Sequence, residues 1–133
     1  MKIRVYYEDT DAAGIVYYAN YLKFCERARS ERFFERGLTP QNEAGYFVVK
    51  RLEADYKKAA RLGDMLQVET ELLERKGASI VLRQKVLKEG ETLFVMRVTL
   101  AFLKEGRPAR IPPDIYSIIS DWSVSGNGSS VSS

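Results

Sequence analysis

Apolar and polar residues alternate along much of the chain with a period of two, which is typical of strands that bury one face. The alternation is clearest at residues 91–103, where one face carries Phe94, Met96, Val98, Leu100 and Phe102. Further strands are predicted at residues 2–9, 46–56, 65–75 and 78–88, and short glycine-containing segments separate the last four strands. In residues 2–9 the buried face is expected to carry Ile3, Val5 and Tyr7.

Between the first two predicted strands the spacing changes to that of a helix. Residues 17–36 favour a helix, and an apolar stripe on it spans about 160°. The stripe consists of Tyr21, Leu22, Phe24, Cys25 and Ala28. Gly37 stands where a C-terminal cap is expected, with Pro40 just beyond it.

The end of the chain divides into a short helix and a polar tail. A helix is expected at residues 114–121, because Ile115, Ile118 and Ile119 recur at helical spacing after Pro112 and Pro113. Residues 122–133 form a Ser- and Gly-rich tail that we expect to be disordered. The sequence therefore predicts one domain over residues 1–121.

These elements predict an α+β fold. The apolar face of the last strand needs a cover, and the helix at residues 17–36 offers the long apolar stripe that such a cover requires. We therefore expect an antiparallel β-sheet wrapped around one long central α-helix.

Composition and charge exclude several classes of protein. The 21 Lys and Arg against 18 Asp and Glu give a net charge of +3 without blocks of one sign, so a nucleic-acid partner is not expected. No apolar run approaches the roughly 18 residues of a membrane span. With one cysteine and no apolar export signal at its start, the chain is expected to be cytoplasmic. The chain contains no histidine, which excludes Ser-His-Asp and Cys-His hydrolase sites and the usual zinc sites, so no metal is predicted.

Candidate chemistry gathers at residues 8–20, where Glu8, Asp9 and Asp11 precede a small turn and the start of the long helix. Helix N-termini offer N–H groups that stabilise an oxyanion, so a hydrolytic site is one interpretation. Turn chemistry or N-capping is the more frequent role of Asp-Thr-Asp before a helix. The nearby tyrosines are either core residues or an aromatic wall for an acyl group. Cys25, on the apolar stripe, is interpreted as a core residue.

Two runs of sequence carry a resemblance to a known family. Residues 4–21 read RVYYEDTDAAGIVYYANY and residues 25–31 read CERARSE. Together they resemble the signature of the 4-hydroxybenzoyl-CoA thioesterase family, and are closest to its YbgC branch, the acyl-CoA thioesterases associated with the Tol-Pal system. The resemblance implies the hot-dog fold and hydrolysis of acyl-CoA.

The resemblance also implies roles for individual residues. Asp11 matches the catalytic carboxylate, and the backbone N–H of Tyr18 matches the amide that polarises the thioester carbonyl. Substrate-binding positions are Tyr7, Tyr17 and Asn20, with Lys76, Arg107 and Arg110 near the coenzyme A phosphates. No cofactor is implied, since coenzyme A is part of the substrate. The family forms dimers or tetramers with the site at the dimer interface, so a homo-oligomer is expected, as edge strands also indicate.

Members of the YbgC branch usually have His where this chain has Tyr18. The chemistry does not require it, because a thiol with a pKa of about 8.5 leaves without a general acid. Asp11 then acts as nucleophile or as general base. Two alternatives remain open: a hot-dog domain that binds acyl-CoA or acyl carrier protein without turnover, and an oligomeric structural partner of envelope machinery.

Overall fold

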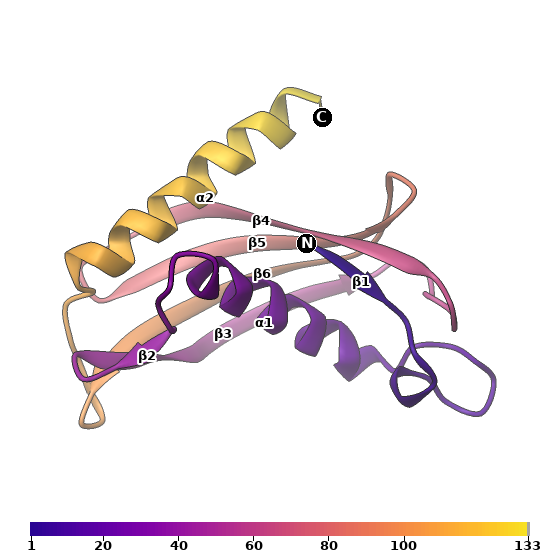
Figure 1. Cartoon of the computed structure of the whole chain (residues 1–133), viewed down its shortest axis with the longest axis horizontal. Coiled ribbons are helices and arrows are strands. Elements are labelled where there is room, and N and C mark those ends of the chain that lie inside the picture. The colour runs from indigo at the N-terminus through magenta and orange to yellow at the C-terminus, as the bar shows by residue number, and fades with distance from the viewer. Residues whose placement is uncertain (133) are drawn as a thin grey trace.

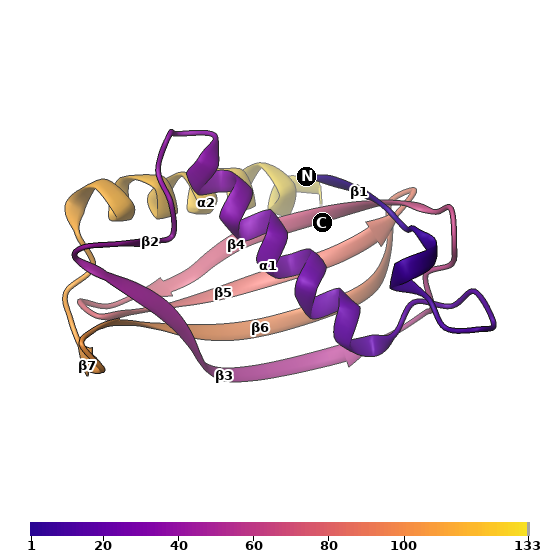
Figure 2. The same ribbon diagram turned by 60° about the horizontal axis from the view of Figure 1, so that its bottom comes forward.

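The computed structural model describes the backbone of residues 1–132 and the side chains of residues 1–122. An antiparallel sheet dominates it, with the strand order β1-β4-β5-β6-β3-β2 and with β7 paired to β6. The strands are β1 (Lys2–Arg4), β2 (Gln41–Asn42), β3 (Gly45–Tyr56), β4 (Met65–Arg75), β5 (Ser79–Lys88), β6 (Glu91–Lys104) and β7 (Arg107–Pro108). The sheet curls, and helix α1 (Tyr18–Phe34) crosses one face of it (Figures 1 and 2). This is the expected fold class, and the four long predicted strands are confirmed.

The apolar face of β6 forms the centre of the core, as predicted. Phe94, Met96, Val98, Leu100 and Phe102 are all buried. Directly paired residues of antiparallel strands share a face, so Leu52, Ala54 and Tyr56 of β3 lie beside them, opposite Val98, Met96 and Phe94. The two-residue strands β2 and β7 were not predicted, because such short pairings leave no periodic pattern.

Helix α1 begins and ends close to the predicted positions. Tyr17 is the N-cap residue. At the other end, Leu38 N donates to Phe33 O at 3.0 Å and Gly37 N donates to Phe34 O at 2.9 Å. These two bonds form a Schellman cap, and Gly37 adopts the φ of +73° that such a cap requires. The capping role predicted for Gly37 is confirmed.

A buried polar network attaches α1 to the sheet. Gln84 of β5 is 0% exposed, and its Nε2 donates to Cys25 O and to Thr70 Oγ1, each at 3.0 Å. Its Oε1 accepts a hydrogen bond from Arg29 Nη1 at 2.8 Å. Burial lowers the pKa of the Arg29 guanidinium. Every polar atom of the Gln84 side chain therefore has a partner, and the network holds α1 over β4 and β5.

The first predicted strand is partly wrong. Only Lys2–Arg4 forms a strand, and the chain then turns through a 3-10 helix, η1 (Tyr7–Asp9), which leaves Tyr7 77% exposed. Local hydrogen bonds explain the turn: Tyr6 N donates to Asp9 Oδ2 at 2.9 Å, and Thr10 Oγ1 donates to Tyr7 O at 2.9 Å. Side chains of this kind compete with strand pairing for the backbone groups.

A second helix, α2 (Pro113–Ser132), packs beside α1 on the sheet. It begins one residue before the predicted helix at 114–121, and its backbone continues beyond residue 121. Ile115, Ile118, Ile119 and Trp122 are buried, so α1 is not the sole cover of the sheet. The predicted tail, residues 122–133, lies almost wholly outside the residues whose side chains are described. No helix in the described part of the chain is long and apolar enough to cross a membrane.

Candidate active site

Asp11 lies at the start of a tight loop that closes on itself. Asp11 N donates to Ile15 O at 2.9 Å, and Gly14 N donates to Asp11 O at 3.0 Å with Gly14 at a φ of +77°. The Asp11 Oδ1 atom accepts from Ala13 N at 2.9 Å and from Ile15 N at 3.2 Å. Turn chemistry is therefore present, as one interpretation of the sequence held. These two hydrogen bonds fix the orientation of the Asp11 carboxylate. Neither of them uses its other oxygen, Oδ2.

A second loop, at residues 57–64, holds the Asp11 loop from the other side. Val16 N donates to Ala60 O at 2.9 Å, and Leu62 N donates to Gly14 O at 2.9 Å. These cross-links join two segments that are far apart in the sequence. They make the position of Asp11 depend on the conformation of residues 57–64.

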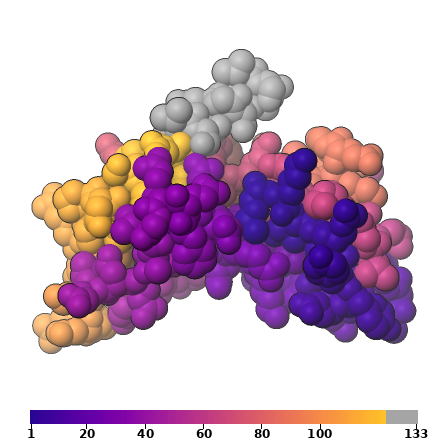
Figure 3. Space-filling view, in the orientation of Figure 1, coloured from indigo at the N-terminus to yellow at the C-terminus, as the bar shows by residue number. Residues whose placement is uncertain are grey.

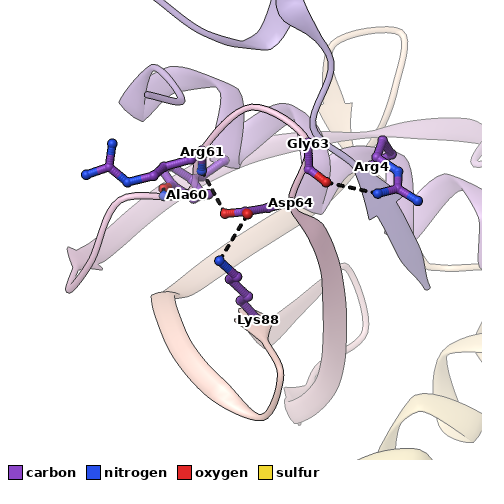
Figure 4. A network of polar contacts seen from close by, with 7 residues as sticks. Arg4, Ala60, Arg61, Gly63, Asp64 and Lys88 are labelled. Atoms are coloured by element: carbon purple, nitrogen blue, oxygen red, sulfur yellow. Dashed lines mark hydrogen bonds and ion pairs between the residues drawn. The ribbon is translucent and has the colours of Figure 1, made fainter. Parts of the chain in front are cut away.

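Asp64 anchors this second loop (Figure 4). Its Oδ2 accepts from Arg61 N at 2.9 Å, and its Oδ1 lies 3.0 Å from Lys88 Nζ. Beside it, Arg4 Nη1 donates to Gly63 O at 2.9 Å. The side chain of Asp64 is mostly buried, with an exposed fraction of 14%. Strands β1 and β5 thus both contribute to holding the loop.

The start of α1 faces the same region. Asp9 O accepts from Asn20 Nδ2 at 2.8 Å and from Tyr17 N at 3.3 Å, which fixes the helix start against η1. Tyr17 makes no side-chain capping bond. Among the described residues, no acceptor is recorded for the N–H groups of Tyr18 and Ala19. Such N–H groups at a helix N-terminus are available to a negatively charged oxygen.

Asp11 and the helix start line one pocket of about 390 Å³. Its lining consists of Asp11, Ile15, Val16, Tyr17, Tyr18, Tyr21, Tyr56, Lys57, Lys58 and Ala59. The tyrosines form an aromatic wall in which the rings of Tyr18 and Tyr56 are 4.6 Å apart and Tyr21 stacks on Phe94 at 5.0 Å. Tyr21 is fixed further because its hydroxyl accepts from Ala60 N at 2.8 Å. Burial raises the pKa of Tyr21, so its hydroxyl stays protonated at neutral pH.

The structure brings some of the predicted site residues together and separates others. Asp11, Tyr17 and Tyr18 share the pocket. Asn20 is 8% exposed and holds the helix start, whereas Tyr7 is exposed on η1 and does not line the pocket.

The predicted basic residues lie elsewhere in a single chain. Lys76 follows β4, Arg107 pairs with Lys104, and Arg110 follows β7, all near the Gly45 end of β3. The Asp11 loop lies at the opposite end of the sheet, and its segment forms one end of the face seen in Figure 3.

Tyr56, Lys57 and Lys58 also line this pocket, although the sequence did not mark them as site residues. Tyr56 was assigned only as the end of a strand, and the two lysines as part of a connection. An aromatic residue ending a strand and followed by two lysines is the signal that was available. Its proximity to Asp11 depends on the contacts between the two loops.

The sequence is similar to those of known thioesterases. Residues 13–95 match the family model described as "Thioesterase superfamily". The acyl-CoA thioesterase YbgC of Haemophilus influenzae is 42% identical over 120 residues, which cover 85% of this chain and 88% of that protein. The acyl-CoA thioesterase YbgC of Helicobacter pylori is 50% identical over 86 residues, and the match spans 65% of the length of each chain.

Solved structures agree with these relatives. A probable thioesterase from Bartonella henselae superimposes with a TM-score of 0.78 at 32% identity, over 84% of this chain and 97% of that one. The family resemblance and the fold inferred from residues 4–31 are confirmed by these matches. Among the described residues, no group of three or more His, Cys, Asp and Glu is arranged to hold a metal ion.

Proposed function

Because the chain belongs to the thioesterase superfamily, we propose that it is an acyl-CoA thioesterase, which hydrolyses the thioester of acyl-coenzyme A to a free acid and coenzyme A. The observation that carries this proposal is the pocket shared by Asp11 and the start of α1. It combines a fixed carboxylate with backbone N–H groups that have no acceptor among the described residues. Those are the two elements that thioester hydrolysis without histidine requires.

The reaction proceeds by one of two routes. As a general base, Asp11 takes a proton from water while the water oxygen attacks the thioester carbonyl carbon. As a nucleophile, Asp11 attacks the same carbon and forms an anhydride, which water then hydrolyses. In both routes the N–H of Tyr18 stabilises the oxyanion, a contribution of about 3 kcal/mol per donor. The oxyanion collapses, the C–S bond breaks, and the thiolate leaves and takes up a proton.

Substrate binding uses the remaining walls of the pocket. The rings of Tyr18, Tyr21 and Tyr56 contact the acyl group, in keeping with their place in the lining. Lys57 is exposed at the same pocket, where it attracts the phosphates of coenzyme A. Lys58 is already paired, with its Nζ 2.5 Å from Glu91 Oε2.

The active unit in this proposal is a homo-oligomer, either a dimer or a tetramer made of two dimers, in the cytoplasm. Strand β3 has only the two-residue β2 beyond it, so most of its outer edge is unpaired. Its inner face also exposes Val49 (53%), Leu52 (36%) and Tyr56 (44%). Pairing of β3 with a two-fold related β3 covers both features. It also brings the Gly45 end of one strand beside the Tyr56 end of the other, and with it Lys76, Arg107 and Arg110 towards the partner's pocket.

Steady-state hydrolysis of an acyl-CoA panel tests the catalytic role of Asp11. We expect Asp11→Asn to lower kcat/KM by roughly a hundredfold or more. Glu8→Gln is the matched control, since Glu8 is an exposed carboxylate of the same segment. Equal rates for wild type and Asp11→Asn contradict the assignment. Tight binding of a non-hydrolysable acyl-CoA with no thiol release across the panel, acyl carrier protein thioesters included, favours a binding domain instead.

A single turnover in ¹⁸O-labelled water separates the two routes. An attack by Asp11 followed by hydrolysis of the anhydride at the Asp11 carbon places the label in the Asp11 carboxylate in that one turnover and releases an unlabelled acid. General-base catalysis leaves the carboxylate unlabelled and places the label in the released acid. Mass spectrometry of the peptide that contains Asp11 distinguishes these outcomes.

A further inference from the structure

A second pocket, of about 250 Å³, lies between the C-terminal half of α1, the start of β3 and Trp122 of α2. It shares no lining residue with the Asp11 pocket. Its walls include Phe33, Phe47, Leu100 and Trp122, with the rings of Phe33 and Trp122 in edge contact at 5.6 Å. The walls are therefore largely apolar and aromatic.

One charged hydrogen-bond donor, Arg29, lies in this apolar lining. Arg29 lines the pocket, and its one recorded hydrogen bond uses Nη1 on Gln84 Oε1. A guanidinium carries five N–H donors, so others remain for a ligand. The indole N–H of Trp122, a residue that is 1% exposed, has no hydrogen-bond acceptor among the described residues, but this atom is buried beneath the lining and is not counted as a donor to a ligand.

The charges around the pocket favour an anionic ligand. Burial lowers the pKa of Arg29, yet a guanidinium stays charged at neutral pH. Glu26 is the acidic residue of the lining, but it is exposed and makes no ion pair with Arg29 within 4 Å. Water screens an exposed carboxylate far more than it screens a charge beneath the surface. The charge of Glu26 acts on Arg29 and offsets part of the effect of burial, but in the described part of the chain no carboxylate lies within 4 Å of the guanidinium, which keeps N–H donors for a second anion.

We propose that this pocket binds a small carboxylic acid, with the carboxylate on Arg29 and an aliphatic or aromatic body between the aromatic walls. The volume of about 250 Å³ equals roughly eight water molecules, which suits an acid of medium chain length. The acid released by a thioesterase belongs to this chemical class. The binding site itself goes beyond the proposed hydrolysis and does not depend on turnover.

Trp122 reports on this pocket directly, because it is the single tryptophan of the chain. We expect octanoate to change its fluorescence in a saturable manner. Octanamide has nearly the same shape without the charge, and we expect it to bind at least tenfold more weakly. This comparison uses the wild-type protein alone, so it does not depend on whether a variant folds. Equal binding of the two probes, or no saturable change with octanoate, overturns the proposal.

Substitutions in the pocket and away from it test where octanoate binds. Arg29→Gln is expected to weaken octanoate binding at least tenfold, whereas Arg27→Gln, an exposed arginine of the same helix, leaves it unchanged. Ser30→Phe fills the pocket while the bond between Arg29 and Gln84 stays, and it should abolish binding. Asp11→Asn should bind octanoate as wild type does, even where its hydrolysis is lost. Binding that is lost in Asp11→Asn but kept in Arg29→Gln places the acid in the Asp11 pocket and overturns the proposal.

Discussion

Cys25 is a thiol whose surroundings suppress its ionisation. It lies on the buried face of α1 and is 0% exposed. Burial raises its pKa from 9.0 to about 12, and the nearby Arg29 guanidinium opposes this only in part. The thiol is therefore protonated at neutral pH, which agrees with its interpretation as a core residue.

The stability of the fold should consequently fall at alkaline pH. The pKa is higher in the folded chain than in the unfolded one, so the folded state holds the proton more tightly. The contribution is complete below pH 9 and is lost as the pH rises from 9 towards about 12. Urea unfolding at a series of pH values measures it. Cys25→Ala should reduce the slope, leaving the part due to Tyr21, whose pKa is also raised; an unchanged slope contradicts the prediction.

The sequence alone left two roles open for Asp11, that of a turn acceptor and that of a catalytic carboxylate. A turn acceptor and a fixed catalytic carboxylate have the same spacing from the following helix, and here Oδ1 makes the bonds of a turn. What favours catalysis is the presence of Tyr18 and Tyr56 around the same pocket. That arrangement involves residues on α1 and β3, so it is absent from the local pattern.

At the level of elements, the site depends on two loops that hold each other. Residues 10–16 bond to residues 57–64, and Asp64 anchors the second loop to β5 through Lys88. The first loop carries the carboxylate, and the second carries the lysines of the pocket. A substitution of Asp64 should therefore affect the active site, although Asp64 does not line the pocket.

Asp64→Ala tests this dependence. Loss of the bonds to Arg61 N and Lys88 should lower the free energy of unfolding by about 1–3 kcal/mol. We also expect a lower kcat/KM, because the loop that supports Asp11 loses its anchor. Asp55→Ala is the control, since Asp55 is exposed on β3. Chemical denaturation and steady-state kinetics measure the two effects, and equal values for Asp64→Ala and Asp55→Ala would contradict the prediction.

At the level of the whole molecule, the two helices cover the sheet unevenly. Helices α1 and α2 contact β4, and α1 also contacts β5, while β3 keeps apolar side chains exposed on the inner face. Exposed apolar residues grouped on one element are typical of an interface. The proposed pairing through β3 follows from this asymmetry.

Leu52→Glu should dissociate the proposed dimer, because its formation would bury an unpaired carboxylate. Leu62→Glu is the control, since Leu62 is 49% exposed on the loop at residues 57–64. Sedimentation velocity at micromolar concentration gives the assembly state of each protein. A monomeric wild type, or a Leu52→Glu variant that assembles as wild type does, would count against the pairing.

The sequence by itself determined the elements whose evidence is local. Periodicity located α1 and the four long strands, Gly37 marked the helix end, and the absence of histidine excluded whole classes of hydrolase. Periodicity failed at residues 5–9, because hydrogen bonds from Asp9 and Thr10 replace strand pairing there.

Tertiary structure alone decided which distant residues share a pocket. Tyr56 joins Asp11, and Trp122 joins Arg29, although each pair is separated by more than 40 residues. Such neighbours arise from the order of strands in the sheet and from the docking of helices on it. Spacing along the chain records the faces of single elements, whereas these contacts depend on how the elements pack together.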